Sequence, residues 1–160
     1  MAKQENMAAS ETAIDETSRG EAMAVLARAT QAELEAAWSD WRDKPEVEPV
    51  RGPETGLVML RGRIGGGGSP FNFGEATVTR ATVRLSTGQV GHAYALGTSK
   101  GKVRYAAIFD ALWQDEQTRD DVEDAVLAPV RRRVQARNES RAAEAAATKV
   151  DFFTMVRGED

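Results

Sequence analysis

Alternating hydrophobic and polar positions predict three β-strands in the middle of the chain, over residues 55–64, 75–85 and 89–97. The alternation is clearest near the end of the second strand, where Ala81, Val83 and Leu85 share one side and Arg80, Thr82 and Arg84 share the other. A tight turn at residues 86–88 joins the last two strands into a hairpin. Prolines at 45, 49 and 53 indicate an extended segment before the first strand that is suited to a sheet edge.

Helical spacing of apolar residues predicts helices before and after these strands in the sequence. A short helix is expected over residues 20–29, and Thr30 with Glu33 has the signature of a capping box that opens a second helix. Residues 101–114 carry an apolar stripe that would pack on the sheet, made of Tyr105, Ile108, Phe109, Leu112 and Trp113.

Two more helices are predicted after the stripe. Thr118 is expected to cap the first of them, and Pro129 to interrupt it before a final helix over about residues 130–147. The fold class is therefore α+β, with an antiparallel sheet of three to four strands and with the N-terminal helix pair and C-terminal helices packed on one face. Residues 1–18 are polar without periodicity and are expected to be a disordered extension, followed by a single domain over residues 19–160.

The composition of the chain excludes several kinds of chemistry and several kinds of partner. The chain of 160 residues has no cysteine, which excludes disulfides and thiolate chemistry, and no stretch long and apolar enough for a membrane span is found. A cytoplasmic protein without a membrane role is expected. The net charge of −4 hides a basic middle, because residues 51–104 carry eight basic and two acidic side chains, net +6. Such a field favours an anion or an acidic partner. Nucleic acid is not expected, because the basic region lacks interleaved aromatic residues.

Candidate anion-binding residues lie in this basic region. The glycine run at residues 65–68 could cradle a phosphate through backbone N–H groups, although a flexible hairpin connection is the preferred interpretation. Arginines 61 and 63 share a face of the first strand, and arginines 80 and 84 share a face of the second, so antiparallel pairing could gather four guanidinium groups near the glycines. The alternative is salt bridging, with Glu54 and Glu75 as the acids in this region. The candidates are Arg63, Gly66, Gly67, Arg80 and Arg84.

His92 is the only histidine, and it alternates with Val90, Tyr94 and Leu96, which indicates the core or a shallow cleft. A packed or hydrogen-bonded structural role is expected for it. It has no visible nucleophile to activate and no accompanying carboxylates for a metal ion, so no metal site is predicted and the catalytic residues stay unknown.

The C-terminal segment, residues 149–160, carries Phe152, Phe153, Met155 and Val156 between charged residues. Four large apolar side chains at a chain end would expose a costly patch unless they dock on a surface. The segment could pack on the chain's own domain or on a partner protein, and the sequence does not choose between them. The four residues are the candidates for partner docking.

This tail resembles the C-terminal signature of the PhnG family. Members of this family are a subunit of the bacterial carbon–phosphorus lyase system for phosphonate catabolism. Further blocks resemble the same family in order: residues 54–57, the glycines at 65–68, residues 73–77, 79–80, 83–85 and 108–112. The resemblance spans about residues 20–158 and leaves residues 1–18 as a variable extension.

The resemblance implies a role in a multi-subunit core complex that displaces adenine from ATP with an alkylphosphonate, giving alpha-D-ribose 1-methylphosphonate 5-triphosphate. It implies partners of the I type, which is thought to carry the nucleosidase chemistry, and then of the H and J types. ATP with Mg would be a substrate of the complex, and an iron–sulfur cluster would belong to another subunit. No cofactor is expected on this chain, whose role would be mainly in assembly. The alternative is direct binding of the triphosphate or phosphonate through a basic sheet face.

Overall fold

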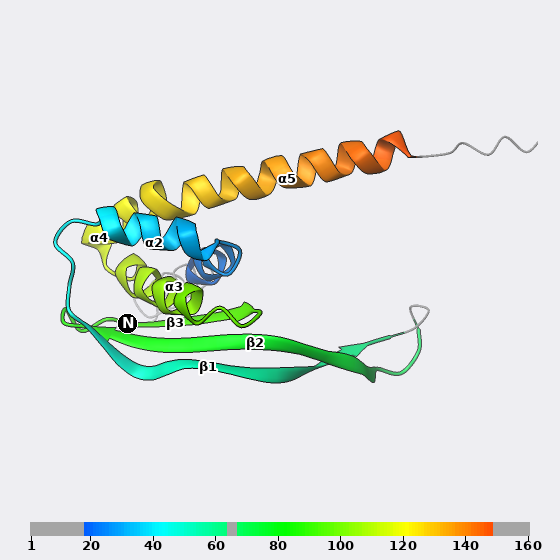
Figure 1. Ribbon diagram of the computed structural model, residues 1–160, viewed down its shortest axis with the longest axis horizontal. Helices are drawn as coiled ribbons and strands as arrows, with labels where there is room; N and C mark the ends of the chain where they lie inside the picture. Colours follow the sequence, from blue (N-terminus) through cyan, green and yellow to red (C-terminus); the bar gives the residue numbers. More distant parts are fainter. Residues whose placement is uncertain (1–17, 64–66, 149–160) are drawn as a thin grey trace, which may run out of the picture.

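A three-stranded antiparallel sheet carries all of the described helices on one face (Figure 1). The computed structural model describes residues 18–63 and 67–148. The strands are β1 (Val47–Gly62), β2 (Phe71–Leu85) and β3 (Val90–Leu96), in the order β1-β2-β3. The predicted α+β class, the strand pairing and the placement of the helices are thereby confirmed.

The helices come before and after the sheet in the sequence. Residues 18–26 form a first helical segment, followed by α2 (Gln31–Asp40). After the sheet come α3 (Lys100–Trp113), α4 (Glu116–Val122), a π-helical turn (Glu123–Leu127) and α5 (Ala128–Ala147). The capping box predicted for α2 is present, because Thr30 Oγ1 accepts a hydrogen bond from the Glu33 N–H while the Glu33 carboxylate accepts one from the Thr30 N–H.

The hydrophobic core lies between the sheet and the helices, and α3 is at its centre. Phe109 is fully buried, and the rings of Trp38 and Trp41 contact it edge-on, with centroids 6.3 and 5.6 Å away. α3 approaches β3 so closely at Gly91 that a Cβ atom there would lie 1.9 Å from the Ala107 carbonyl oxygen. The predicted apolar stripe thus forms the layer that joins the sheet to the outer helices.

Both long strands extend further than the sequence pattern predicts. β1 begins at Val47 because the proline-containing segment continues directly into the predicted strand, and β2 begins at Phe71. The pairing of β1 with β2 shifts register between Pro49 and Arg51 and again between Arg51 and Glu54. These bulges accommodate the prolines on an edge strand, where a missing N–H leaves no gap in the ladder.

The helix boundary predicted at Thr118 is wrong. Asp115 is the N-cap of α4, since its carboxylate accepts from the Gln117 N–H at 2.9 Å. Thr118 lies inside the helix and donates its hydroxyl to the Leu112 carbonyl at 2.6 Å. Pro129 does not end the helical path, because the preceding π-helical turn changes the backbone register and leaves the proline in the first turn of α5.

Two parts of the fold project away from the core on the same side (Figure 1). One is the outer part of the β1–β2 ribbon, which continues past the end of β3 because β3 pairs only with residues 78–84 of β2. The other is α5, whose residues 135–147 are all exposed. No helix among the described residues has the length and apolar character needed to cross a bilayer.

Candidate functional site

Part of the predicted site lies outside the described residues. This holds for Gly66 and for the whole tail with Phe152, Phe153, Met155 and Val156. Arg63 and Gly67 are described, and both are exposed at the tip of the β1–β2 ribbon.

The register of β1 and β2 keeps the predicted arginines apart. Arg61 pairs with Asn72, whereas Arg80 pairs with Glu54 and Arg84 with Glu48. Arg80 is eight residues beyond Asn72 along β2, which at about 3.3 Å per residue is a separation of roughly 26 Å. The guanidinium groups at residues 80 and 84 therefore do not join those at 61 and 63 beside the glycine run.

Arg80 and Arg84 instead form ion pairs across the strands, the alternative that the sequence left open. Arg80 Nη2 lies 3.1 Å from Glu54 Oε2, and Arg84 Nη1 lies 3.6 Å from Glu48 Oε2. All four side chains are about half exposed or more, so each pair contributes about 1 kcal/mol or less to stability. The pairing neutralises this end of the uncovered sheet face.

His92 does not face the core, which is one of the two positions expected for it, the other being a shallow cleft. Ala93 and Ala95 of β3 are buried, and the intervening His92 and Tyr94 point to the opposite, uncovered face. The hydrogen-bonded role is confirmed, because His92 Nδ1 lies 3.1 Å from Thr82 Oγ1 on the neighbouring strand. The alternation of β3 could not show which of its two faces the helices cover, because both faces carry apolar residues.

The uncovered face becomes apolar toward the projecting end of the ribbon. Paired residues of antiparallel strands point to the same side, so Leu60 lies on the face of Gly74, and Gly62 on the face of Phe71. The ring of Phe73 lies over Gly62, where a Cβ atom would come within 2.8 Å of it. Together with β3, this face exposes four large apolar side chains and a tyrosine: Leu60, Phe71, Phe73, Leu96 and Tyr94. We call this set the open apolar face, and an exposed patch of this kind is typical of protein interfaces.

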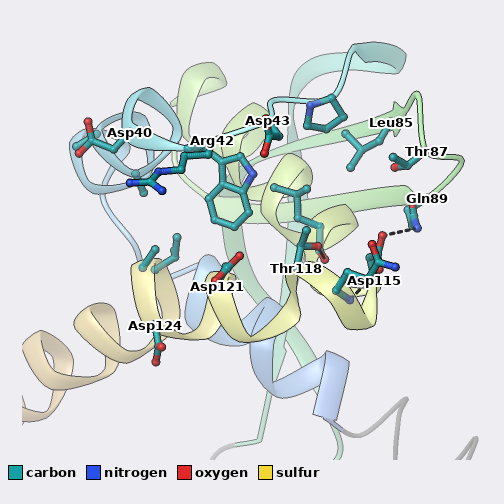
Figure 2. Close-up of a pocket in the computed structure, with 18 of the residues that line it drawn as sticks. Asp40, Arg42, Asp43, Leu85, Thr87, Gln89, Asp115, Thr118, Asp121 and Asp124 are labelled. Carbon is teal, nitrogen blue, oxygen red and sulfur yellow. Dashed lines mark hydrogen bonds between the residues drawn. The ribbon is translucent and has the colours of Figure 1, made fainter.

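A cavity of about 1060 Å³ between α2, the end of the sheet and the α4 region is lined mainly by acidic side chains among its charged residues. Its lining includes Asp40 and Asp43 from the end of α2, and Asp115, Asp121 and Asp124 from the segment around α4 (Figure 2). Arg42 is the single basic side chain in the described lining. No three of the described His, Asp and Glu side chains come together as a set that could hold a metal ion. The negative charge makes this cavity unsuited to phosphate groups.

Sequence reasoning missed the most buried ion pair of the described structure. Asp110 is 1 % exposed, and Arg19 donates to both of its carboxylate oxygens, at 3.0 and 2.7 Å. The only signal in the sequence is an acidic residue within the apolar stripe of α3. Its partner, Arg19, lies 91 residues away in the sequence, at the predicted end of the disordered extension. No local pattern there indicates an ion pair.

A second charged cluster joins α2 to α5. Arg133 donates to the Glu33 carboxylate, with its Nε atom 2.5 Å from Oε1, and Lys102 Nζ donates to the Ala27 carbonyl at 2.7 Å. Burial raises the pKa of Glu33, but hydrogen bonds from Arg133 and Thr30 outweigh it and hold the pKa below its usual value. Burial, together with the Arg133 charge, lowers the pKa of Lys102. These contacts tie the helices together.

Two comparisons with known proteins identify the family of this chain. The family described as "Phosphonate metabolism protein PhnG" matches residues 17–158. A relative from Rhizobium meliloti (strain 1021), named "Alpha-D-ribose 1-methylphosphonate 5-triphosphate synthase subunit PhnG", is 64% identical over 142 residues, which is 89% of this chain and 90% of the relative. The match extends from the helical segment that holds Arg19 to the end of the apolar tail, so the chain belongs to the PhnG family.

Proposed function

We propose that this chain is a subunit of alpha-D-ribose 1-methylphosphonate 5-triphosphate synthase, the assembly for which its relative is named. The observation that carries the proposal is 64% identity over nearly the full length of both proteins. The assembly would act in the cytoplasm and displace adenine from ATP with an alkylphosphonate. ATP with Mg is then a substrate of the whole complex. Any iron–sulfur cluster belongs to another subunit, because this chain has no cysteine to ligate one.

Within the complex, the main role of this chain is in assembly. Its single histidine is exposed and hydrogen-bonded to a threonine. The described ionisable side chains that are buried or partly buried between the helices form structural ion pairs. The open apolar face is a surface for another subunit, since a two-stranded ribbon is marginally stable unless further contacts support it. We place the I-type subunit there first, with the H and J types as further members of the assembly. The tail, with Phe152, Phe153, Met155 and Val156, is proposed as a second docking element.

A growth assay tests the proposed function. A bacterium lacking its own gene of this family is given the gene for this chain and supplied with methylphosphonate as its sole phosphorus source. Growth is expected, together with co-purification of the host's synthase subunits. Growth on inorganic phosphate is the control. Failure to grow on methylphosphonate, despite soluble expression and assembly with the host subunits, would contradict the proposal.

Direct binding of the triphosphate by this chain is the second candidate function. The face bearing Arg80 and Arg84 supports it less well than the sequence suggested, because both arginines already pair with glutamates. Another group of cations, around a cavity at the start of α3, favours it instead.

A further inference from the structure

A cavity of about 490 Å³ lies where the bulged part of β1 passes the beginning of α3. The two register shifts between Pro49 and Glu54 displace the edge strand from regular pairing. Ala81 and Val83 of β2, both buried, contribute to its apolar lining together with Val47, Pro49 and Pro53 of β1. Its volume is within the range of roughly 300–1,000 Å³ that is usual for small-molecule sites.

Three cationic side chains line this cavity: Arg51 from the bulge, and Lys100 and Arg104 from α3. Lys100 and Arg104 are four residues apart on one helix and therefore lie on the same face. None of the described lining residues carries a carboxylate. None of these three cations forms an ion pair with another described residue, unlike Arg80 and Arg84 on the opposite face of the sheet. The positive charge of the cavity is thus not neutralised from within the described part of the chain.

The orientation of α3 adds to this positive charge. Ser99 caps the helix by accepting a hydrogen bond from the Lys102 N–H, so the positive end of the helix dipole lies beside the Lys100 and Gly101 that line the cavity. A helix N-terminus favours phosphate groups, and guanidinium groups match phosphate oxygens in a fork-like geometry. Cations around an apolar lining suit a ligand that has a polyanionic chain attached to a less polar body.

We propose that this cavity binds the triphosphate chain of a nucleoside triphosphate or of the sugar triphosphate made from it. The inference rests on the proposed function, which supplies a triphosphate substrate and product, and it names the site where this chain holds them. Arg51, Lys100 and Arg104 contact the phosphate oxygens, and Ala81, Val83 and the prolines of β1 face the remainder of the ligand. The chain then contributes to substrate binding in addition to assembly.

Calorimetric titration of the full-length chain at physiological salt with Mg²⁺ tests the proposal. The probes are ATP, inorganic tripolyphosphate, orthophosphate and adenosine. ATP and tripolyphosphate are expected to bind more tightly than orthophosphate, and adenosine to give no signal. The variant R51Q/K100Q/R104Q should weaken ATP binding by roughly a thousandfold, since it removes three charged contacts and each costs roughly tenfold. Single substitutions should give partial losses, and R51K/R104K should retain part of the affinity.

Two matched variants separate a specific site from a general charge effect. R137Q/R141Q removes two exposed arginines of α5 and should leave ATP affinity within about twofold. R80Q/R84Q tests the uncovered face in the same way and should also bind ATP normally. Circular dichroism of every variant confirms that it is folded, which is expected because all of the substituted side chains are exposed.

Several results would overturn the inference. These are absence of ATP and tripolyphosphate binding to the full-length chain, equal losses in the control variants, or a preference of the cavity for an acidic peptide over both triphosphates. The growth assay keeps the two proposals distinguishable. If the wild-type gene supports growth on methylphosphonate while the chain binds no triphosphate, the cavity proposal fails and the subunit function stands.

Discussion

Arg19 holds the buried carboxylate of Asp110 with two hydrogen bonds, and the same carboxylate accepts the backbone N–H of His92 at 2.8 Å. Three elements meet at this one side chain: the first helical segment, β3 and α3. A buried charge is tolerated only when it is paired and hydrogen-bonded. The contact therefore fixes where the N-terminal segment packs.

Replacing Asp110 with alanine should destabilise the chain by about 3–5 kcal/mol, because Arg19 would lose both hydrogen bonds to this buried carboxylate and the His92 N–H would lose its acceptor. Urea unfolding of the purified chain measures this. Glu54→Ala is the matched control, since it breaks an exposed ion pair with Arg80 and should cost about 1 kcal/mol or less. Equal losses in the two variants would show that the buried pair has no special role.

Gly91→Ala should destabilise the fold by about 3 kcal/mol or more, because the new methyl group would overlap the backbone of α3 at Ala107 and Ala111. Gly56→Ala makes the same chemical change in β1, where nothing lies within 4 Å of the added atom. Thermal unfolding should separate the two variants clearly. A Gly91→Ala protein as stable as Gly56→Ala would contradict the close packing of β3 on α3.

The Glu33–Arg133 contact predicts a specific pH dependence. Because the pKa of Glu33 is lower in the folded chain than its usual value of 4.5, folding favours its ionised form. The stabilisation is present above the unfolded pKa and is lost as the pH falls through the folded pKa. The free-energy difference between wild type and Glu33→Gln should thus be largest near pH 7 and shrink below about pH 4.5. Denaturant titrations between pH 3 and pH 7 measure it, and a constant difference would contradict the assignment.

Substitutions in the open apolar face should weaken binding to the partner subunit without destabilising the chain itself. Phe71→Ser together with Phe73→Ser should weaken binding to the partner subunit by about 2 kcal/mol or more, roughly thirtyfold in Kd. Stability of the chain alone should change by less than about 1 kcal/mol, because both rings are about half exposed already. Leu57→Ser with Met59→Ser, on the other face of the same ribbon, is the control for lost apolar area. Unchanged partner affinity in the phenylalanine variant would remove this face from the interface.

Deletion of residues 150–160 should abolish co-purification with the I-type subunit if the apolar tail is a docking element. The reason is the loss of four apolar side chains that would otherwise be buried in the contact. Pull-down from cells that co-express both subunits measures the effect. Deletion of residues 1–17 is the control for shortening the chain. Intact assembly after the C-terminal deletion would refute the docking role.

Features that depend on neighbouring residues could be predicted from the sequence. The capping box of α2, the β2–β3 hairpin, the apolar stripe of α3 and the antiparallel α+β class all follow from periodicity and turn chemistry over a few residues. The helix start at Asp115 was missed because two suitable capping residues stand three positions apart, and only packing selects between them.

The candidate site depended on contacts between distant residues. The bulges of β1 set which arginines meet which glutamates, and they open the cavity that brings Arg51 near Lys100 and Arg104. The side of the sheet that the helices cover decides that His92 is exposed and that Phe71 and Phe73 form a surface. Local patterning determined the elements and their class, because hydrophobic period and capping act within one turn or strand. Only the tertiary structure decided the charge pairing and the binding surfaces, because register and layer packing join residues that are tens of positions apart in the chain.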